Sequence, residues 1–381
     1  MSAAPPVTED AALRRVIDRV ASARATRTPL CLRGHGSKDF YGEAPRGEAL
    51  EMAALAGIAR YEPTELVVTV RAGTPIVELE AALAECGQCL AFEPPRFGDG
   101  TACGTSEQTV PRRGTVGGMV ATGLAGPARA AVGGVRDFVL GAALLDAGGE
   151  VLRFGGAVMK NVAGYDVSRL LVGSMGILGP ILEVSLKVLP VPPARTTLRF
   201  EWPQAKALEQ LQRWAGQPLP LRASAWWNDM LVLQLAGAQA AVRAATQSMG
   251  GEAIDAQAAE HFWSGLRDQR DEFFVAAAEA VNAGATLWRV SVAPHAPPLA
   301  SAGEQLIEWH GGQRWIVNQA DAPTMRALAV AAGGHATAFR GHKSGGAFTP
   351  LAAPLQRMHQ RLKARFDPDG LFNPGRLYPD L

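Results

Sequence analysis

The sequence predicts an α+β protein of two or three domains, and three observations lead to that prediction. The chain has 381 residues, and a globular domain typically holds roughly 150. Hydrophobic residues make up 48% of the chain and charged residues 19%, which is enough apolar material for compact cores. The composition also changes near residue 194, where glycine becomes rarer and a tryptophan-rich region follows, from Trp202 to Trp288.

In the first part of the chain, strands and helices alternate with glycine-rich turns. Residues 11–25 place Leu13, Val16 and Val20 on one stripe with arginines opposite, which indicates an amphipathic helix. Residues 66–70 are rich in β-branched side chains, which favour a strand. The other strands predicted here are 30–33, 138–145, 150–154 and 181–189, and the other helices are 75–84 and 119–124.

The second part reads as a separate α+β unit. Strand-like and helical segments alternate from about residue 196 to residue 331, as in a domain built on antiparallel strands. Residues 333–350 contain five glycines and predict a loop-rich joint. Residues 355–366 then predict a basic amphipathic helix that ends at the Asp367-Pro368 pair.

The composition excludes several classes of protein. A formal net charge of +1 argues against the strongly basic surface that is typical of nucleic-acid-binding proteins. The first ten residues lack the cationic and apolar regions of a signal peptide. No run of about 18 apolar residues predicts a membrane-spanning helix. We therefore expect a cytoplasmic protein.

The four cysteines give no cofactor site. Cys86 and Cys89 have C-x-x-C spacing, but Cys31 and Cys103 do not form a second pair. An iron–sulfur cluster needs four suitably arranged thiolates. Free thiols are the expectation, with a redox-active disulfide as the alternative.

A first candidate binding segment follows the predicted strand 30–33. Arg33-Gly34-His35-Gly36-Ser37-Lys38 can turn several backbone N–H groups toward one point, which would form a nest for a phosphate anion. Glycine permits the positive φ angles that such a nest requires. An ordinary turn after a strand is the alternative for this segment.

Two further segments combine glycines with small or polar residues. Residues 114–123 have small side chains at nearly every position, which leaves their backbone accessible to a ligand or to close packing of a helix on a sheet. Residues 160–166 place Asn161 and Tyr165 among glycines, and the glycine-rich stretch 170–179 follows.

The order of these motifs resembles the FAD-binding family of vanillyl-alcohol-oxidase type. The motifs are RGHGSK at 33–38, TVGGMVATG at 115–123, KNVAGYDVSRLLVGSMGILG at 160–179 with ILEVSLKVLP after it, and FDPDGLFNPGRL at 366–377. Within that family the chain is most similar to the FAD-binding subunits of bacterial glycolate oxidases. The matching motifs span residues 30–190 and 355–377, about half of the chain.

The resemblance implies a PCMH-type FAD-binding domain of two lobes. That domain would span residues 1–193, with lobes at about 1–75 and 76–193 and with FAD between them. Residues 194–330 would form an α+β cap domain. Residues 331–381 would be a C-terminal segment that returns to the FAD domain.

The resemblance also implies which residues hold FAD. Residues 33–38 would wrap the diphosphate, residues 115–122 would follow the ribityl chain and the flavin, and Ile181 would meet the adenine end. Asn373 would return to the flavin region. The full implied set is Arg33, Gly34, His35, Gly36, Ser37, Lys38, Ala72, Gly73, Thr115, Val116, Gly117, Gly118, Ala121, Thr122, Asn161, Gly164, Tyr165, Ile181 and Asn373.

Two departures from the family bear on mechanism. Ser37 stands where some relatives carry a histidine that links to the flavin, so we expect non-covalent FAD. The histidines that hold a metal in related dehydrogenases have no counterpart, so we expect no metal site. Arg340, His342 and Lys343 remain candidates for binding a substrate carboxylate, with solvated loop charges as the alternative.

The resemblance implies the FAD-binding subunit of a multi-subunit glycolate (2-hydroxy acid) oxidase. Its partners would be a larger homologous FAD subunit and an iron–sulfur subunit. The resemblance implies a cytoplasmic complex that associates with the inner face of the cell membrane. The alternatives are a self-sufficient FAD-dependent 2-hydroxy-acid dehydrogenase and a non-catalytic flavin-binding scaffold.

Overall fold

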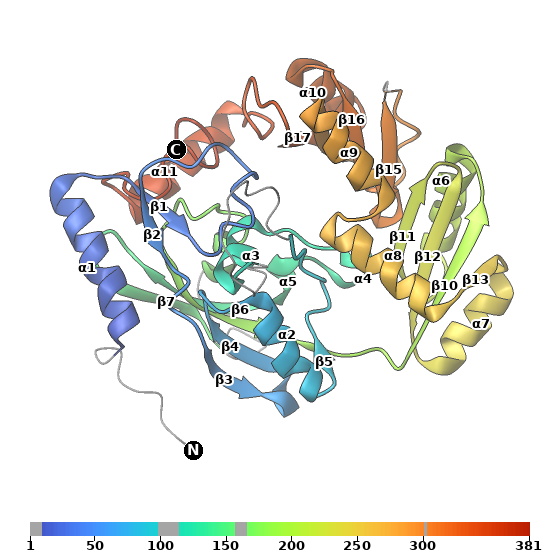
Figure 1. Cartoon of the computed structure of the whole chain (residues 1–381), viewed down its shortest axis with the longest axis horizontal. Helices are drawn as coiled ribbons and strands as arrows, with labels where there is room; N and C mark the ends of the chain where they lie inside the picture. Colours follow the sequence, from blue (N-terminus) through green and yellow to red (C-terminus); the bar gives the residue numbers. More distant parts are fainter. Residues whose placement is uncertain (1–9, 98–113, 157–165, 301–302) are drawn as a thin grey trace.

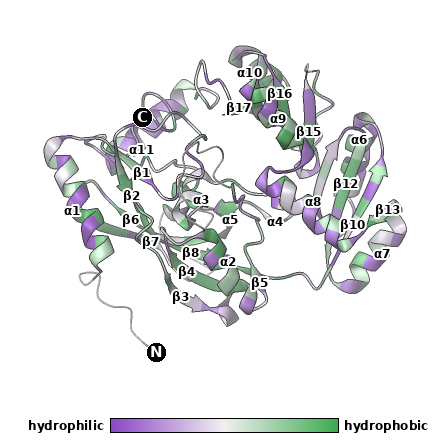
Figure 2. Cartoon of the chain, in the orientation of Figure 1, coloured by the Kyte–Doolittle hydropathy of each residue, from purple (hydrophilic) through white to green (hydrophobic). Residues whose placement is uncertain are grey.

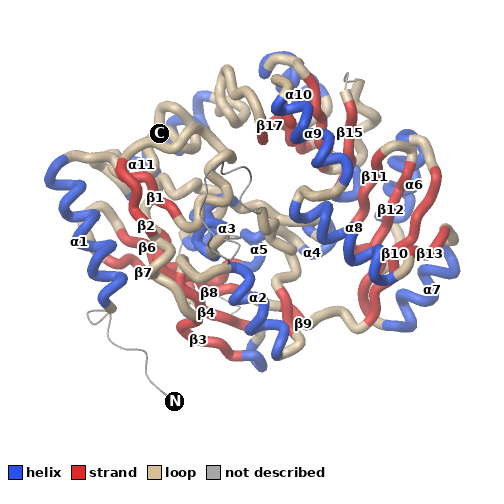
Figure 3. Tube along the Cα trace, viewed as in Figure 1, coloured by secondary structure: helices blue, strands red, loops and turns tan. Residues whose placement is uncertain are grey.

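The computed structural model describes residues 10–97, 114–156, 166–300 and 303–381 (Figure 1). Two antiparallel sheets organise these residues, one of five strands and one of eight. The five-stranded sheet lies in the half of the molecule that also holds the C-terminus, and the eight-stranded sheet lies in the other half. Figure 3 shows the helices arranged around both sheets.

The five-stranded sheet has helices on both faces. Its inner strand β6 (Val139–Leu145) is buried at all seven positions, because Ala142 and Leu144 face one apolar cluster and Ala143 and Leu145 face another. Helices α2 (Ile76–Glu85) and α3 (Val116–Thr122) pack into the first cluster, and α1 (Ala11–Thr26) packs into the second. The strand order is β3 (Ile58–Glu62), β4 (Val67–Arg71), β8 (Ile181–Lys187), β6 and β7 (Val151–Gly155).

Short elements connect this half. They are the pair β5 (Gln88–Cys89) and β9 (Leu189–Pro190), helices α4 (Arg129–Val132) and α5 (Val135–Phe138), and the 3-10 turns η1 (Pro63–Glu65) and η2 (Ser168–Leu171).

The C-terminal segment returns to the start of the chain. Strand β1 (Leu30–Arg33) pairs in parallel with β2 (Glu48–Glu51), and Leu30 also bridges Phe372. Helix α11 (Ala353–Phe366) is fixed by the buried ammonium of Lys363, which contacts Asp367 and the carbonyls of Ile177 and Phe372. This network brings the segment after α11 beside β1.

The eight-stranded sheet takes its strands from distant parts of the chain. Figure 2 shows apolar residues along its strands and mixed faces on its helices. The strand order is β13 (Glu252–Ile254), β10 (Ala194–Glu201), β12 (Met230–Gly237), β11 (Leu221–Trp227), β15 (Glu304–Glu308), β16 (Gln313–Asn318), β14 (Thr286–Ser291) and β17 (His335–Arg340). The helices are α6 (Gln204–Ala215), α7 (Gln239–Met249), α8 (Ala256–Asp268), α9 (Glu272–Asn282) and α10 (Ala322–Ala331), and η3 (Trp309–Gly311) joins β15 to β16.

The two faces of this sheet pack differently. Leu287 and Phe339 lie in a cluster that also contains Tyr41 and Phe97 of the first half. Helices α8 and α9 contribute to the same cluster. The opposite face packs on α6, α7 and α10. The inner face of the eight-stranded sheet therefore meets the first half of the molecule.

The structure confirms the predicted α+β class and corrects one prediction. Residues 333–350 were expected to be a loop-rich joint, but His335–Arg340 forms the edge strand β17 beside β14. Its small residues between glycines look like a turn in the sequence, whereas pairing with β14 buries Ala336 and Ala338. The domain boundaries at residues 75, 193 and 330 stay predictions, and the sheet that starts at Ala194 continues to Arg340.

Candidate functional site

A cleft beside β1 and α3 collects most of the residues that the sequence predicts to bind a cofactor. Its volume is about 830 Å³, including solvent at its mouth. Segments 31–39, 115–122, 175–181 and 373–376 supply most of its lining. The predicted residues that line it are Arg33, Gly34, His35, Gly36, Ser37, Lys38, Ala72, Thr115, Gly117, Gly118, Ala121, Thr122, Ile181 and Asn373.

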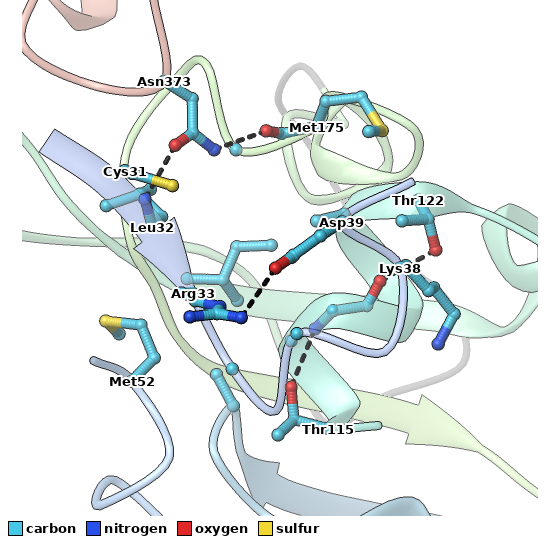
Figure 4. Close-up of a pocket in the computed structure, with 18 of the residues that line it drawn as sticks. Cys31, Leu32, Arg33, Lys38, Asp39, Met52, Thr115, Thr122, Met175 and Asn373 are labelled. Carbon is cyan, nitrogen blue, oxygen red and sulfur yellow. Dashed lines mark hydrogen bonds and ion pairs between the residues drawn. The ribbon is translucent and has the colours of Figure 1, made fainter. Parts of the chain in front are cut away.

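The turn after β1 requires glycine for two separate reasons. Gly36 has φ +71°, a left-handed conformation that side chains disfavour. A Cβ on Gly34 would lie 2.4 Å from Thr115 Oγ1, because the turn packs directly against the start of α3. Arg33 and Asp39 form an ion pair of 2.9 Å across the turn (Figure 4). This turn forms one wall of the cleft.

Helix α3 forms the facing wall and exposes little side chain. Thr115 caps the helix by accepting a hydrogen bond from the Gly118 N–H at 3.2 Å. A Cβ on Gly117 would lie 2.8 Å from the Ala72 Cβ, so glycine permits α3 to pack closely on β4. Thr122 directs its hydroxyl back to the Gly118 carbonyl at 2.8 Å. A ligand in the cleft therefore meets mostly backbone and small side chains.

Asn373 closes one end of the cleft and fixes its geometry. Its Oδ1 accepts a hydrogen bond from the Leu32 N–H at 2.7 Å, and its Nδ2 donates to the Met175 carbonyl at 2.6 Å (Figure 4). A Cβ on Gly176 would lie 2.6 Å from the same Nδ2. Both polar groups of Asn373 thus bind backbone, and the side chain holds β1 against residues 175–176.

Two buried cations give the cleft its charge. Lys38 is 8% exposed, and burial lowers the pKa of its ammonium to about 8, against a smaller raising effect of Asp268. Arg376 is also buried and donates to the carbonyls of Lys38 and Asp39. Its Nη1 has no hydrogen-bond partner among the residues that the structure describes. An anion in the cleft would compensate both groups.

The sequence did not single out Arg376, although it lies in the NPGRL motif that carries Asn373. The signal that could have found it is a basic residue three positions after the predicted contact. Arg376 lies more than 300 residues after Lys38 in the chain, so no local sequence pattern could predict that it donates to the Lys38 carbonyl.

Five predicted cofactor residues do not line the cleft or cannot be assessed. Gly73 packs on the backbone of residues 52–55, where a Cβ would lie 2.2 Å from the Met52 carbonyl oxygen. Val116 is fully buried, and its N–H donates to the Thr74 carbonyl. Asn161, Gly164 and Tyr165 lie outside the described residues.

The three candidates for carboxylate binding differ in their contacts, although Arg340 and Lys343 both lie against Phe40. The Arg340 guanidinium lies 3.5 Å from the centre of the Phe40 ring and donates to Gln269 Oε1 at 3.4 Å. Lys343 donates to the Phe40 and Gly42 carbonyls, and His342 is exposed. Burial lowers the pKa of Arg340 to about 10 and that of Lys343 to about 8. Of the three, the Arg340 side chain is the one that lies among the aromatic rings of Phe40, Phe97 and Phe339.

Comparison with known proteins identifies the family to which this chain belongs. The family described as "FAD binding domain" matches residues 11–155. Over 366 residues the chain is 44% identical to glycolate oxidase subunit GlcE of Escherichia coli (strain K12), a match that covers 96% of this chain and 97% of that protein. The chain belongs to the GlcE family of glycolate oxidase subunits.

Other relatives match the GlcE-family chain over shorter stretches. Glycolate oxidase subunit GlcD of Bacillus subtilis (strain 168) is 30% identical over 174 residues, which is 45% of this chain and 34% of that protein. A D-2-hydroxyglutarate dehydrogenase of Xanthomonas citri pv. viticola is 28% identical over 169 residues, 44% of this chain and 33% of that protein.

A solved structure shares the fold of the GlcE-family chain. Alkyldihydroxyacetonephosphate synthase superposes with a TM-score of 0.63 over 95% of this chain and 75% of that one, at 15% identity. This likeness supports the fold alone. The matching FAD binding domain confirms the predicted cofactor, FAD. In the described residues, no helix combines the length and apolar character needed to cross a membrane.

Proposed function

We propose that this chain is the FAD-binding subunit of a multi-subunit glycolate (2-hydroxy acid) oxidase and that it holds FAD without a covalent bond. The observation that carries the proposal is the match to GlcE along nearly the whole of both chains. The cleft supports it independently, because glycine walls and the buried cations Lys38 and Arg376 suit a large anionic ligand.

The residues of the cleft fit the parts of FAD. The turn 33–38 and the buried cations Lys38 and Arg376 would hold the diphosphate, since oriented backbone N–H groups and positive charge favour phosphate oxygens. Residues 115–122 would follow the ribityl chain, and Ile181 would contact the adenine end. Ser37 offers a hydroxyl in place of an imidazole, so no group at this position would form a histidyl link to the flavin.

Bound FAD supplies the two-electron chemistry by which a 2-hydroxy acid becomes a 2-oxo acid. The chain itself contributes binding, exclusion of water and the electrostatic setting of the cleft. Asn373 and Arg376 would act as positioning residues, because both bind the backbone that forms the cleft walls.

We also propose two partners for this chain. A larger FAD subunit similar to GlcD and an iron–sulfur subunit would complete the oxidase and carry the electrons onward. The support for the first is that GlcE and GlcD are both named as glycolate oxidase subunits and both resemble this chain. The complex would act in the cytoplasm, at the inner face of the cell membrane.

An absorbance spectrum of the purified chain tests the proposal. Flavin bands at about 375 and 450 nm that move to the supernatant after acid precipitation are expected for non-covalent FAD. Anaerobic glycolate should leave these bands unchanged unless the partner subunits are added. Bleaching by glycolate alone would replace the subunit proposal with a self-sufficient dehydrogenase. A colourless chain that FAD cannot reconstitute would contradict it.

A further inference from the structure

Helix α11 carries an excess of positive charge on its exposed side. It contains four basic residues and no acidic residue. Lys363 is buried and pairs with Asp367, whereas Arg357, Arg361 and Arg365 are exposed. None of these three arginines forms an ion pair with another residue that the structure describes. In a chain of net charge +1, α11 is therefore a local concentration of unpaired positive charge.

The three arginines form a row along the helix. They follow one another at intervals of four residues, and residues at that spacing lie on one side of a helix. Since a helix rises 1.5 Å per residue, neighbouring arginines of the row start about 6 Å apart. A guanidinium binds a carboxylate through two parallel hydrogen bonds. The row therefore fits carboxylates that are repeated at a similar spacing.

Two exposed apolar side chains lie along one side of the arginine row. Leu355 is 49% exposed and Met358 is 64% exposed. They are three residues apart, so they are neighbours on the helix surface. Among the described residues, α11 is the one helix with two exposed large apolar side chains. Arginine and methionine are enriched in protein–protein interfaces, whereas lysine is depleted.

A pocket borders the arginine row on its other side. Its volume is about 660 Å³ including solvent at its mouth. Its apolar walls come from Phe348, Pro350, Leu351 and Tyr378. Gln356, which precedes the first arginine of the row, lines the pocket and donates to Asp380 Oδ2 at 2.7 Å. The other carboxylate of the pocket, Glu43, accepts a hydrogen bond from the Ala347 N–H. Both carboxylates already bind groups of this chain, so the apolar walls are the part of the pocket that a partner would fill.

The protein holds α11 firmly in place. Leu362 and Phe366 pack against the core of the five-stranded sheet, and the Phe366 ring lies 6.1 Å from that of Phe154. The buried Lys363 ammonium binds the Ile177 and Phe372 carbonyls. Figure 1 shows α11 at the periphery of the molecule, beside the C-terminus. A surface that is already ordered loses little conformational freedom when a partner binds.

We propose that the α11 surface, made of Leu355, Arg357, Met358, Arg361, Arg365 and the adjoining pocket, docks an acidic amphipathic helix of a partner subunit. Carboxylates four residues apart on that helix would match the arginine row. Apolar side chains beside them would pack on Leu355 and Met358, and one would enter the pocket. The inference rests on the proposed function, which supplies the partner subunits, and it adds where one of them binds.

The size of the surface supports contact beyond the helix itself. A stable protein–protein interface buries about 800 Å² on each partner. A helix of 14 residues is about 21 Å long, so one exposed side of α11 supplies only part of that area. The pocket beside Gln356 extends the surface, and an anchoring side chain in such a pocket typically contributes much of the affinity.

The structure favours a protein over an anionic membrane as the occupant. A helix that binds in a membrane interface inserts its apolar face among the lipids. The apolar face of α11 is already packed on the core through Leu362 and Phe366. Leu355 and Met358 alone offer little apolar area for insertion, and three arginines attract anionic lipid only weakly.

Binding of purified partner subunits to the immobilised full-length chain tests the inference. The larger FAD subunit and the iron–sulfur subunit of the proposed oxidase are titrated separately, and we expect saturable binding of at least one. Its affinity should fall as NaCl increases from about 50 to about 300 mM, because salt screens exposed charges.

Arg361→Glu is the sharpest variant. It places a carboxylate four residues from both Arg357 and Arg365, where it can pair with either. We expect the affinity for the partner subunit to fall about tenfold or more and its salt dependence to weaken. Arg361→Gln removes one charge without reversing it and should lose less. Met358→Asp should weaken binding of the same subunit at both salt concentrations.

Two variants elsewhere are matched controls. Arg243→Glu on α7 reverses an exposed arginine, and Val275→Asp on α9 replaces an apolar side chain that is 51% exposed. Both should leave the affinity unchanged. Circular dichroism and flavin content check that every variant is folded and holds its cofactor.

The outcomes separate this inference from the proposed function. If the native chain binds a partner subunit and Arg361→Glu and Met358→Asp bind it equally well, the inference alone is wrong. If the native chain binds neither subunit, the proposed partners are wrong and the inference with them, and the flavin spectrum still reports separately on FAD. Binding to vesicles of phosphatidylcholine and phosphatidylglycerol that Arg361→Glu abolishes, with subunit binding intact, would replace the partner protein with a membrane.

Discussion

The cleft and a smaller second cavity are lined by different kinds of residue. The second cavity lies between residues 124–127 and the inner face of the eight-stranded sheet. The cleft is lined mainly by backbone and small side chains from segments 33–38 and 115–122, whose shape depends on glycine. The second cavity is lined by aromatic and long polar side chains such as Trp315, Glu308 and Arg289, which come from separate strands. The comparison teaches that a cleft can be built mainly from short continuous turns, whereas a cavity lined by side chains of several strands depends on long-range assembly.

The largest effect should come from the turn of the cleft. Gly36→Asp places a side chain at φ +71°, 2.7 Å from Arg33 Nη2, and adds a negative charge where the diphosphate is proposed to bind. We expect the purified variant to contain no FAD. Flavin content per chain, from absorbance, measures this, with circular dichroism as the check that the fold persists. A folded variant with normal flavin content would place the diphosphate elsewhere.

This contrast explains how much the sequence could predict. Gly34, Gly36, Thr115 and the neighbouring residues lie in short continuous motifs, and the family resemblance that these motifs carry implied one shared site for them. Glu308 and the strand β17 gave no such signal. The role of β17 depends on pairing with β14, about 45 residues earlier in the chain.

Residues that serve packing also limit prediction from motifs. Gly73 and Val116 lie within the motifs of the cleft, yet Gly73 packs on the loop at residues 52–55 and Val116 enters the apolar core. A motif records both ligand contacts and the packing beneath them, and only the structure separates the two.

The second largest effect should come from Arg376. Arg376→Met removes two hydrogen bonds to the carbonyls of Lys38 and Asp39 and one buried positive charge. These bonds hold the turn that is proposed to bind the diphosphate, and a charge-assisted hydrogen bond typically contributes about 1.5–3 kcal/mol. Because the variant loses both the support of the turn and a buried positive charge, we expect FAD affinity to fall about tenfold. Equilibrium dialysis of FAD measures it. Arg357→Met, on α11 and outside the cleft, is the control. An equal loss of FAD affinity in both variants would mean that Arg376 has no specific role in FAD binding.

Lys38 should show opposite effects on binding and on stability. Its ammonium is buried and its pKa is lowered to about 8, so the FAD-free chain gains stability as pH rises from about 8 toward the ordinary lysine pKa of 10.5. Lys38→Met should therefore raise the melting temperature of the FAD-free chain at about pH 7. The same variant should bind FAD with an affinity several-fold lower. Thermal unfolding with and without FAD measures both. A fall in both quantities would show that Lys38 serves packing alone.

The last effect concerns stability alone, leaves FAD binding unchanged, and should appear at Glu308 as a slope in stability with pH. Burial raises the pKa of Glu308 from 4.5 to about 7, so the folded chain binds more protons than the unfolded chain between these values. The stability contributed by the protonated group is complete below about pH 4.5 and is lost as pH rises through about 7.

Glu308→Gln removes this ionisation and keeps an oxygen for the Trp315 N–H. We expect the variant to be more stable than the native chain at about pH 8, on the order of 2 kcal/mol since each pKa unit corresponds to ~1.36 kcal/mol, and to be equal to it near about pH 5. Urea unfolding at both pH values measures the difference. An identical pH slope in the two proteins would mean that Glu308 ionises freely, and the contrast between a backbone-lined cleft and a charge-lined cavity would then rest on Arg267 and Arg289.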